Sequence, residues 1–428
     1  MLNRKIQPEI KAIEQISIAV PQRKTMSNGI PLNVIEAGNQ DVVRVDILIG
    51  AGKWHQTQLL QTLFTNRMLR EGTKRFTSAE IAEKLDYYGA WLELSTSMEY
   101  SYITLYSLNK YFANTLEIVE SIVKEPVFPE KELSTVVETN KHQFLINSTK
   151  VEYLAQKSFA SSIFGEEHPC GRFAMEADYD KVTSDCLKEF YYQYYHSGNC
   201  SIYISGKVTD EILNLLENSF GKESWGKIEN KVLTLPAEIK TTSLKRVFTE
   251  QDSAMQSSIK MGKVMIQRTH PDYYKMRVLI TIFGGYFGSR LMSNIREDKG
   301  YTYGISSGIA SYPDAGVFVV STEAANEYAE DIIKEVYNEM KTLQTELVPA
   351  SELEMVRNYM LGEMCRSYEG PFSLSDAWMF IQTSHLSDSY FEESLKAVQN
   401  VTAEELRSLA QRYFNQENMI EVVSGKKL

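Results

Sequence analysis

Several features that identify common classes of protein are scarce in this chain. No apolar run approaches the roughly 18–20 residues of a membrane span, and the first residues lack the apolar core of a secretory signal peptide. Lys and Arg form no dense cluster and the net charge is −11, which disfavours a nucleic-acid partner. We therefore predict no membrane span and a cytoplasmic location, or a periplasmic one if a leader has been removed.

Metal-binding residues are also sparse. The four cysteines include no C-x-x-C pair, which argues against a zinc ribbon or a redox dithiol. A zinc site on one helix needs two imidazoles about one turn apart. No two of the six histidines lie within five residues of each other: they are His55, His142, His168, His196, His270 and His385. The sequence therefore predicts no metal site within this chain.

An internal repeat organises the 428 residues, whose composition is ordinary for a globular protein. Two segments share a pattern of helix end, polar turn and alternating strand: QYYHSGNCSIYISGK and QRYFNQENMIEVVSGKK. Their glycines, Gly206 and Gly425, are 425 − 206 = 219 residues apart. The words TLF at Thr62 and TIF at Thr281 have the same offset, 281 − 62 = 219. An offset near half the chain length predicts a duplicated domain.

The stretch between the repeats is polar and contains glycines and a proline, which is typical of a linker. We predict a first domain over 1–222, a linker over 223–239 and a second domain over 240–428. Residues 41–50 alternate apolar and polar side chains, which predicts a half-buried strand. Strand-like and helix-like stretches come in runs, so we expect the α+β class, with a mixed, mainly antiparallel sheet packed against helices in each domain.

Five segments, taken in chain order, carry a family resemblance. They are SNGIPLNVIEAG (27–38), TLFTNRMLREGTKRFTSAEIAEKLDYYGA (62–90), HPCGRFAMEADYDKVT (168–183), FGGYFGSRLMSNIREDKGYTYGISS (283–307) and ELEMVRNYMLGEM (352–364). They resemble the insulinase/pitrilysin/mitochondrial processing peptidase family of zinc peptidases. The resemblance covers nearly the whole chain and implies two homologous peptidase-like domains.

The resemblance also shows what is missing. Active members carry H-x-x-E-H on the helix of the second segment, where two imidazoles hold Zn²⁺ and the Glu activates its bound water. Aligned on Gly72, this chain has Leu63, Asn66 and Arg67 at the first-ligand, base and second-ligand positions. Leu63 has no donor atom, Asn66 cannot accept a proton, and Arg67 carries a permanent positive charge. We therefore predict no catalytic residue and no metal ligand here.

The carboxylate that completes the family's zinc site is expected within residues 136–140. Glu138 is close, but the alignment favours Thr139 or Asn140. A shift of one or two residues does not restore the motif, because no histidine lies between His55 and His142.

Another part of the family pattern is retained. Arg296 and Tyr303 stand seven residues apart in IREDKGYTYG, and the resemblance implies the Arg/Tyr pair that grips substrate across the chamber from the zinc. A guanidinium offers a fork of donors to a carbonyl or carboxylate, and a phenol adds one more polar group. Tyr301 is a competing choice for the tyrosine. The alternative interpretation is that Arg296 is a solvated cation at a helix end and that Tyr303 is packed within a strand.

These features together predict a non-catalytic, substrate-binding subunit of a heterodimeric zinc metallopeptidase that acts on peptides or unfolded polypeptide. A homologous partner would supply H-x-x-E-H and the zinc, so this chain needs no cofactor. It would hold peptide through Arg296, Tyr303 and an open strand edge. The alternatives are a structural core-type subunit and a peptide-binding homodimer with no peptidase role. An active enzyme with an unusual metal site is disfavoured because the histidines form no pair.

Overall fold

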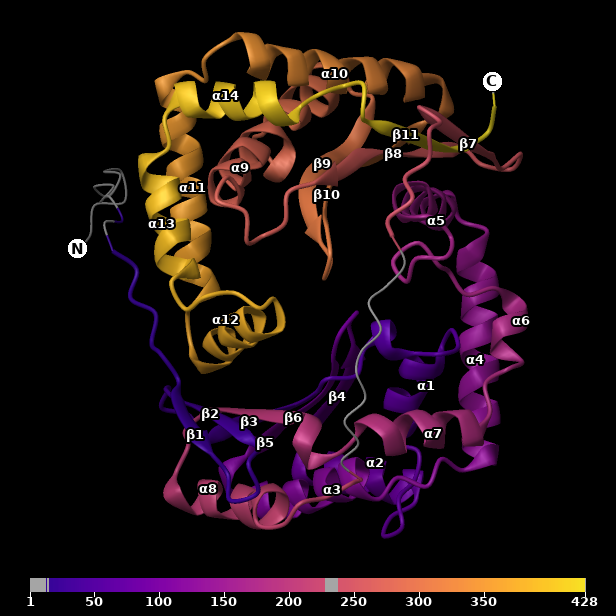
Figure 1. The fold of residues 1–428 in the computed structure, drawn as a ribbon, viewed down its shortest axis with the longest axis vertical. Helices are drawn as coiled ribbons and strands as arrows, with labels where there is room; N and C mark the ends of the chain where they lie inside the picture. Colours follow the sequence, from indigo (N-terminus) through magenta and orange to yellow (C-terminus); the bar gives the residue numbers. More distant parts are fainter. Residues whose placement is uncertain (1–12, 14, 228–237, 428) are drawn as a thin grey trace, which may run out of the picture.

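The strands of the protein form two sheets, one in each half of the chain (Figure 1). The computed structural model describes residues 13, 15–227 and 238–427. The first sheet has the order β1-β2-β6-β3-β5-β4 and the second β7-β11-β8-β10-β9. Their bounds are β1 Gln22–Thr25, β2 Pro31–Glu36, β3 Val42–Ile49, β4 Trp91–Thr96, β5 Ser101–Leu108, β6 Cys200–Gly206, β7 Arg246–Glu250, β8 Gln256–Met265, β9 Thr302–Ser311, β10 Gly316–Ala325 and β11 Ile420–Gly425.

Helices surround both sheets. Those of the first half are α1 Gln61–Met68, α2 Ser78–Tyr88, α3 Phe112–Lys124, α4 Glu130–Ser148, α5 Val151–Phe164, α6 Glu176–Tyr179, α7 Ser184–Tyr194 and α8 Asp210–Leu216. Those of the second half are α9 Tyr273–Ile280, η5 Thr281–Gly285, η6 Met292–Asp298, α10 Ala329–Thr345, α11 Ala350–Ser367, α12 Pro371–Thr383, α13 Tyr390–Asn400 and α14 Ala403–Tyr413. Runs of strands and helices around mainly antiparallel sheets confirm the α+β prediction.

The two halves repeat one topology. In each sheet one parallel pair, β2 with β6 and β7 with β11, is followed by three antiparallel strands. The 219-residue offset maps helices onto helices: 184 + 219 = 403 and 194 + 219 = 413 are the bounds of α14. The same offset takes α5 to 370–383, against 371–383 for α12. The predicted duplication is therefore present in the fold.

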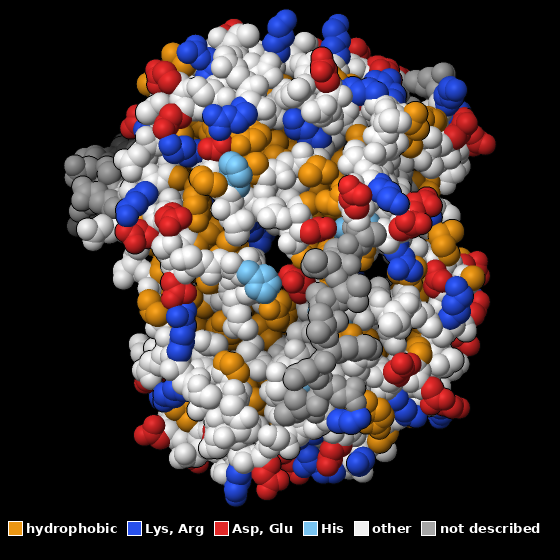
Figure 2. Space-filling view, viewed as in Figure 1, with side chains coloured by type: hydrophobic (Ala, Val, Ile, Leu, Met, Phe, Trp, Pro, Cys, Tyr) orange, Lys and Arg blue, Asp and Glu red, His pale blue; other side chains and the backbone are white. Residues whose placement is uncertain are grey.

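One helix of each half packs against the sheet of the other half. Helix α5 packs on β8 and β11 of the second sheet, and its repeat partner α12 packs on β2 and β6 of the first. Figure 1 shows the two helices on opposite sides of a ring, and Figure 2 shows the molecular surface hollowed between its halves. This exchange closes the ring, because each sheet buries one face under its own helices and the other face under a helix from the far half.

The exchange corrects the prediction for residues 41–50. That stretch forms β3, but both of its faces are covered, and Arg44 and Asp46 are 6% and 0% exposed. The Arg44 guanidinium lies 2.9 Å from the Asp46 carboxylate and 2.6 Å from Asp376 of α12. The alternation of apolar and polar residues in 41–50 therefore reflects a polar face that contacts another part of the chain rather than solvent. Periodicity alone does not distinguish a polar face covered by protein from one exposed to solvent.

Two histidine–carboxylate pairs join the halves at repeat-related places. His168, which follows α5, lies 2.9 Å from Asp314 in the β9–β10 turn. His385, which follows α12, lies 3.4 Å from Glu99 in the β4–β5 turn. The first imidazole is fully buried, whereas the second is 64% exposed. Because the backbone N–H of Cys170 donates to Nδ1 of His168 (3.1 Å), a neutral imidazole can donate from Nε2 to Asp314.

Most of the predicted linker, 223–239, falls on residues 228–237, outside the described part of the chain. The domain boundaries stay predictions. Within the described ranges, no helix is long and apolar enough to cross a membrane, as the sequence predicted.

Candidate functional site

Helix α1 contains Leu63, Asn66 and Arg67, the positions that the sequence resemblance assigned to the lost motif, and most of its side chains are buried. Asn66 is 1% exposed, and its amide Nδ2 donates to the carbonyl of Tyr102 (3.4 Å). Its neighbour Tyr195 is fully buried, and burial raises the pKa of Tyr195 to about 12, so the phenol stays neutral. Leu63 is half-buried. The predicted base position therefore belongs to the first half's core.

Arg67 lies at the exposed end of an aromatic cluster. Tyr179 of α6 contacts Phe64 of α1 (ring centroids 6.1 Å apart) and Phe144 of α4 (5.3 Å). Partial burial lowers the pKa of Arg67, and the phenol of Tyr179 acts in the opposite direction. A guanidinium does not titrate near neutral pH. A fixed positive charge therefore stands at the position that the sequence analysis assigned to the second metal ligand.

Helix α4 supplies no carboxylate to this place. Thr139 and Asn140 turn back onto their own helix: Thr139 Oγ1 donates to the Thr135 carbonyl (2.8 Å), and Asn140 Nδ2 donates to the Val136 carbonyl (2.7 Å). Glu138 is exposed. Among the residues that the structure describes, no group of three His, Cys, Asp or Glu could hold a metal ion. The donor set does not fit zinc.

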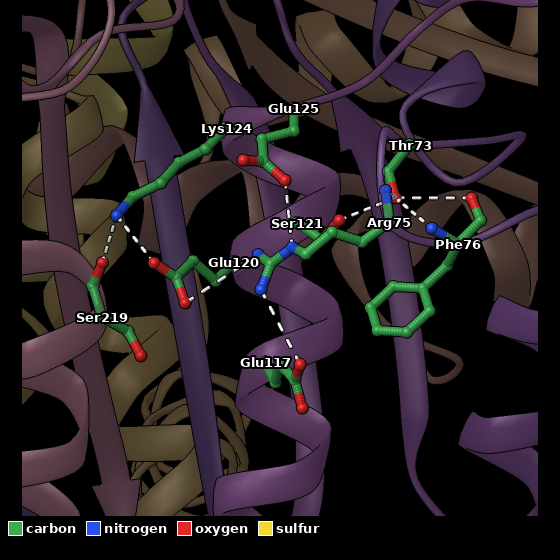
Figure 3. A network of polar contacts seen from close by, with 9 residues as sticks. All are labelled: Thr73, Arg75, Phe76, Glu117, Glu120, Ser121, Lys124, Glu125 and Ser219. Atoms are coloured by element: carbon green, nitrogen blue, oxygen red, sulfur yellow. Dashed lines mark hydrogen bonds and ion pairs between the residues drawn. The ribbon is translucent and has the colours of Figure 1, made fainter.

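The loop that leaves α1 is nevertheless firmly held (Figure 3). The Thr73 hydroxyl oxygen accepts hydrogen bonds from Ser121 Oγ (2.7 Å) and from the Phe76 backbone N–H (2.9 Å). Arg75 reaches across to the Glu125 carboxylate (3.0 Å). The loop after α1 is thus tied to α3 and to the residue that follows it.

The structure brings Arg296 and Tyr303 together at one cavity of about 690 Å³ in the second half. Arg296 lies in the last turn of η6, with its guanidinium carbon 4.5 Å from the centre of the Phe287 ring. Gly300 has φ +66°, a conformation that favours glycine, and it turns the chain from η6 into β9. Tyr301 stacks on Tyr328 (4.6 Å, 17°) and is half-buried, so it packs rather than projects.

Tyr303 projects because it lies in a β-bulge. Thr302 pairs with Ala324 and Ile305 with Thr322, so Tyr303 and Gly304 together stand opposite one residue of β10. A bulge re-aims side chains beside functional sites, and Tyr303 is 93% exposed. The sequence prediction missed the bulge. Its signal was the glycine directly after the tyrosine, inside a strand pattern.

A second cavity, of about 840 Å³, extends the first one. The two share Gln256, Glu323 and Ala325, and the second reaches Lys150 and Glu152 where α4 meets α5. The Arg/Tyr site therefore opens into a groove, here called the Arg/Tyr groove, whose walls come from both halves of the chain. Sequence reasoning missed this extension, because it depends on the exchange of α5.

Comparison with known proteins places this architecture in a family. Residues 33–166 match the model of the insulinase family (peptidase family M16), and residues 181–360 match the model of the peptidase M16 inactive domain. The chain belongs to the M16 family. The resemblance predicted from the motifs is confirmed.

Relatives and a solved structure agree with this assignment. An uncharacterized zinc protease, YmxG, from Bacillus subtilis is 22% identical over 408 residues, which cover 94% of this M16 chain and 98% of that protein. A non-peptidase homolog YmxG from Helicobacter pylori is 25% identical over 243 residues, covering 56% and 55%. A peptidase M16 inactive domain from Pseudomonas fluorescens shares the fold, with a TM-score of 0.83, 23% identity and coverage of 95% and 98%.

Proposed function

We propose that this chain is the substrate-binding subunit of a two-chain zinc metallopeptidase that acts on peptides or unfolded polypeptide. A homologous partner carries the zinc and the general base, and this chain closes the other side of the chamber. The observation that carries the proposal is the contrast between α1, which has no metal donor, and the Arg/Tyr groove, where Tyr303 is almost fully exposed.

The groove offers the groups that a peptide backbone needs. Arg296 supplies several N–H donors, and its contact with Phe287 limits the positions of the guanidinium. The phenol of Tyr303 adds a donor or an acceptor at the end of a rigid ring. Strand β9 pairs only with β10 in the described sheet, so its other edge is open to an added strand. Edge addition binds through the main chain and therefore tolerates many sequences.

The cysteines bear on the compartment in which the subunit acts. All four cysteines are unpaired, and burial raises the pKa of both Cys170 and Cys200, which makes these thiols unreactive. Free thiols suit a reducing compartment, so we propose that the subunit acts in the cytoplasm.

Peptide binding to the purified chain tests the proposal. We expect Arg296→Met and Tyr303→Phe each to weaken binding of a fluorescent unfolded peptide, Arg296→Met by about tenfold, since one charge-assisted hydrogen bond is worth about 1.5 kcal/mol or more. Arg70→Met is the matched control, because Arg70 is an exposed cation outside the groove. Equal binding by all four proteins would contradict the proposal.

The same experiment separates the alternatives. A structural core-type subunit predicts no peptide binding at all. A peptide-binding homodimer predicts binding that depends on Arg296, together with self-association and no gain of activity on adding a chain with H-x-x-E-H. The proposed subunit predicts binding by the chain alone and cleavage only with such a partner.

A further inference from the structure

A third cavity lies at the centre of the ring, where the tips of two hairpins meet. It is lined by the β4–β5 turn, the β9–β10 turn, the loop after β8 and the end of α12, and its volume is about 280 Å³. In Figure 1 both hairpins point into the space between the halves, and Figure 2 shows the surface hollowed there. We call it the hairpin cavity. Because its walls come from both halves, it exists only in the closed ring.

Arg268 is the principal charged group of this cavity that lacks a counter-ion. Its guanidinium carbon lies 4.5 Å from the Phe380 ring centre, and Nη1 donates to Ser384 Oγ (2.8 Å). Within the described residues, Nε is buried without an acceptor and no carboxylate lies within 4.0 Å of the guanidinium. The Arg268 guanidinium is therefore held in position by the Phe380 ring and the Ser384 hydroxyl, while most of its five N–H donors have no acceptor within the described residues. Such a group favours an added anion.

The remaining lining residues indicate which chemical group lies next to the anion in a bound ligand. Tyr100, Tyr102 and Phe380 contribute aromatic surface, and burial raises the pKa of Tyr100, so its phenol stays uncharged. Glu99 is the acidic group in the lining, and it is already paired with His385. The backbone of His385 has φ +53°, a strained conformation for a residue other than glycine. Aromatic walls around one uncompensated guanidinium fit a carboxylate that carries an apolar neighbour.

Strand β9 links this cavity to the Arg/Tyr groove. Tyr303 lies near its start and Ser311, which lines the hairpin cavity, at its end. They are 311 − 303 = 8 residues apart, or about 26 Å at roughly 3.3 Å per residue. A peptide of eight or nine residues added to the open edge of β9 would span from one site to the other.

We propose that the hairpin cavity binds the C-terminal carboxylate of such a peptide through Arg268 and so sets where the peptide lies along β9. This inference deepens the proposed function and rests on it. A carboxylate anchor at one end and Arg296 with Tyr303 at the other would measure peptide length, because only a chain of about eight residues or more engages both.

The test compares one labelled nine-residue peptide with an apolar last residue, either with a free C-terminal carboxylate or as the amide, by fluorescence anisotropy. We expect amidation to weaken binding about tenfold in the unaltered chain and less than twofold in Arg268→Gln. Arg268→Lys keeps a charge and should restore part of the discrimination, which excludes simple misfolding. Arg70→Gln is the control outside the cavity and should discriminate like the unaltered chain.

Two results would overturn the inference. One is equal binding of acid and amide by the unaltered chain, with Arg296→Met still weakening both; the proposed function would then stand without the anchor. The other is an amidated peptide with an internal Glu that binds as tightly as the free acid in an Arg268-dependent manner, which would assign the cavity to acidic side chains. Failure of every peptide to bind would instead reject the proposed function itself.

Discussion

Equivalent positions in the two halves contain different side chains on the same scaffold. At the 219-residue offset, Arg67 of α1 corresponds to position 67 + 219 = 286 and Asn140 of α4 to 140 + 219 = 359. In the second half these residues are Tyr286 and Tyr359, whose ring centres lie 5.0 Å apart. In the second half these two positions contact each other through aromatic rings, whereas in the first half Asn140 bonds to its own helix.

The edge strands β4 and β9 differ between the halves in their backbone pairing. Strand β4 pairs with β5 in continuous register, whereas its counterpart β9 contains the bulge that exposes Tyr303. The exposed tyrosine of the bulge therefore occurs in the second half only. The Arg/Tyr groove, the hairpin cavity and the edge of β9 all lie on that half or at its junction with the first.

The largest expected effect concerns the exchanged helices. Phe159 of α5 and Trp378 of α12 correspond at the offset, 159 + 219 = 378, and are 5% and 3% exposed. We expect Phe159→Ala and Trp378→Ala each to lower the free energy of unfolding by about 3–5 kcal/mol, measured by denaturant titration. Tyr87→Ala, at a site 80% exposed, should cost under about 0.5 kcal/mol. A cost from only one of the two core variants would show that the exchange is not symmetric.

The histidine pairs should differ in strength. His168→Ala leaves Asp314 and the Cys170 N–H without their partner in a buried place, so we expect a loss of about 1–3 kcal/mol. His385→Ala removes an exposed contact and should cost less than about 1 kcal/mol. Thermal unfolding of the two variants compares them directly. Equal losses would contradict the assignment of His168 as the stronger link.

Substitutions of Arg67 and Arg296 should differ in their effect on peptide binding. Arg67→Met should leave peptide binding unchanged, while Arg296→Met weakens it about tenfold, because only Arg296 lies at the groove. The readout is the dissociation constant of one peptide for both variants. Weaker binding in Arg67→Met alone would place the substrate against α1 instead.

The smallest effect comes from a surface pair between the halves. Arg23 and Asp388 form two hydrogen bonds of 2.8 Å, which lower the pKa of Asp388. A carboxyl with a lowered pKa in the folded state contributes stability above its unfolded pKa of about 3.9, and that contribution is lost as the pH falls through the folded value. Both side chains are about half exposed, so Asp388→Asn should cost at most about 1 kcal/mol at pH 7. The difference should shrink in unfolding titrations as the pH falls below about 3.9 and through the lowered folded pKa of Asp388.

Much of this architecture was predictable from local sequence. The Ser-Gly-Lys repeats predicted the duplication, and the strand and helix patterns predicted the α+β class. What could not be predicted depends on contacts between distant segments. The burial of Arg44 requires α12, and the groove beside Arg296 requires α5 from the other half. The exposure of Tyr303 depends on its register with β10, which one strand's sequence does not specify.

We propose that this chain binds peptide but has no catalytic metal of its own. The most direct measurement is the zinc content and the chelator-sensitive peptidase activity of the purified chain, with and without a homologous chain that carries H-x-x-E-H. We predict no stoichiometric zinc and no cleavage by the chain alone, and cleavage that a chelator abolishes once the partner is added. One tightly bound zinc per chain, together with peptide cleavage by the chain alone, would contradict the account.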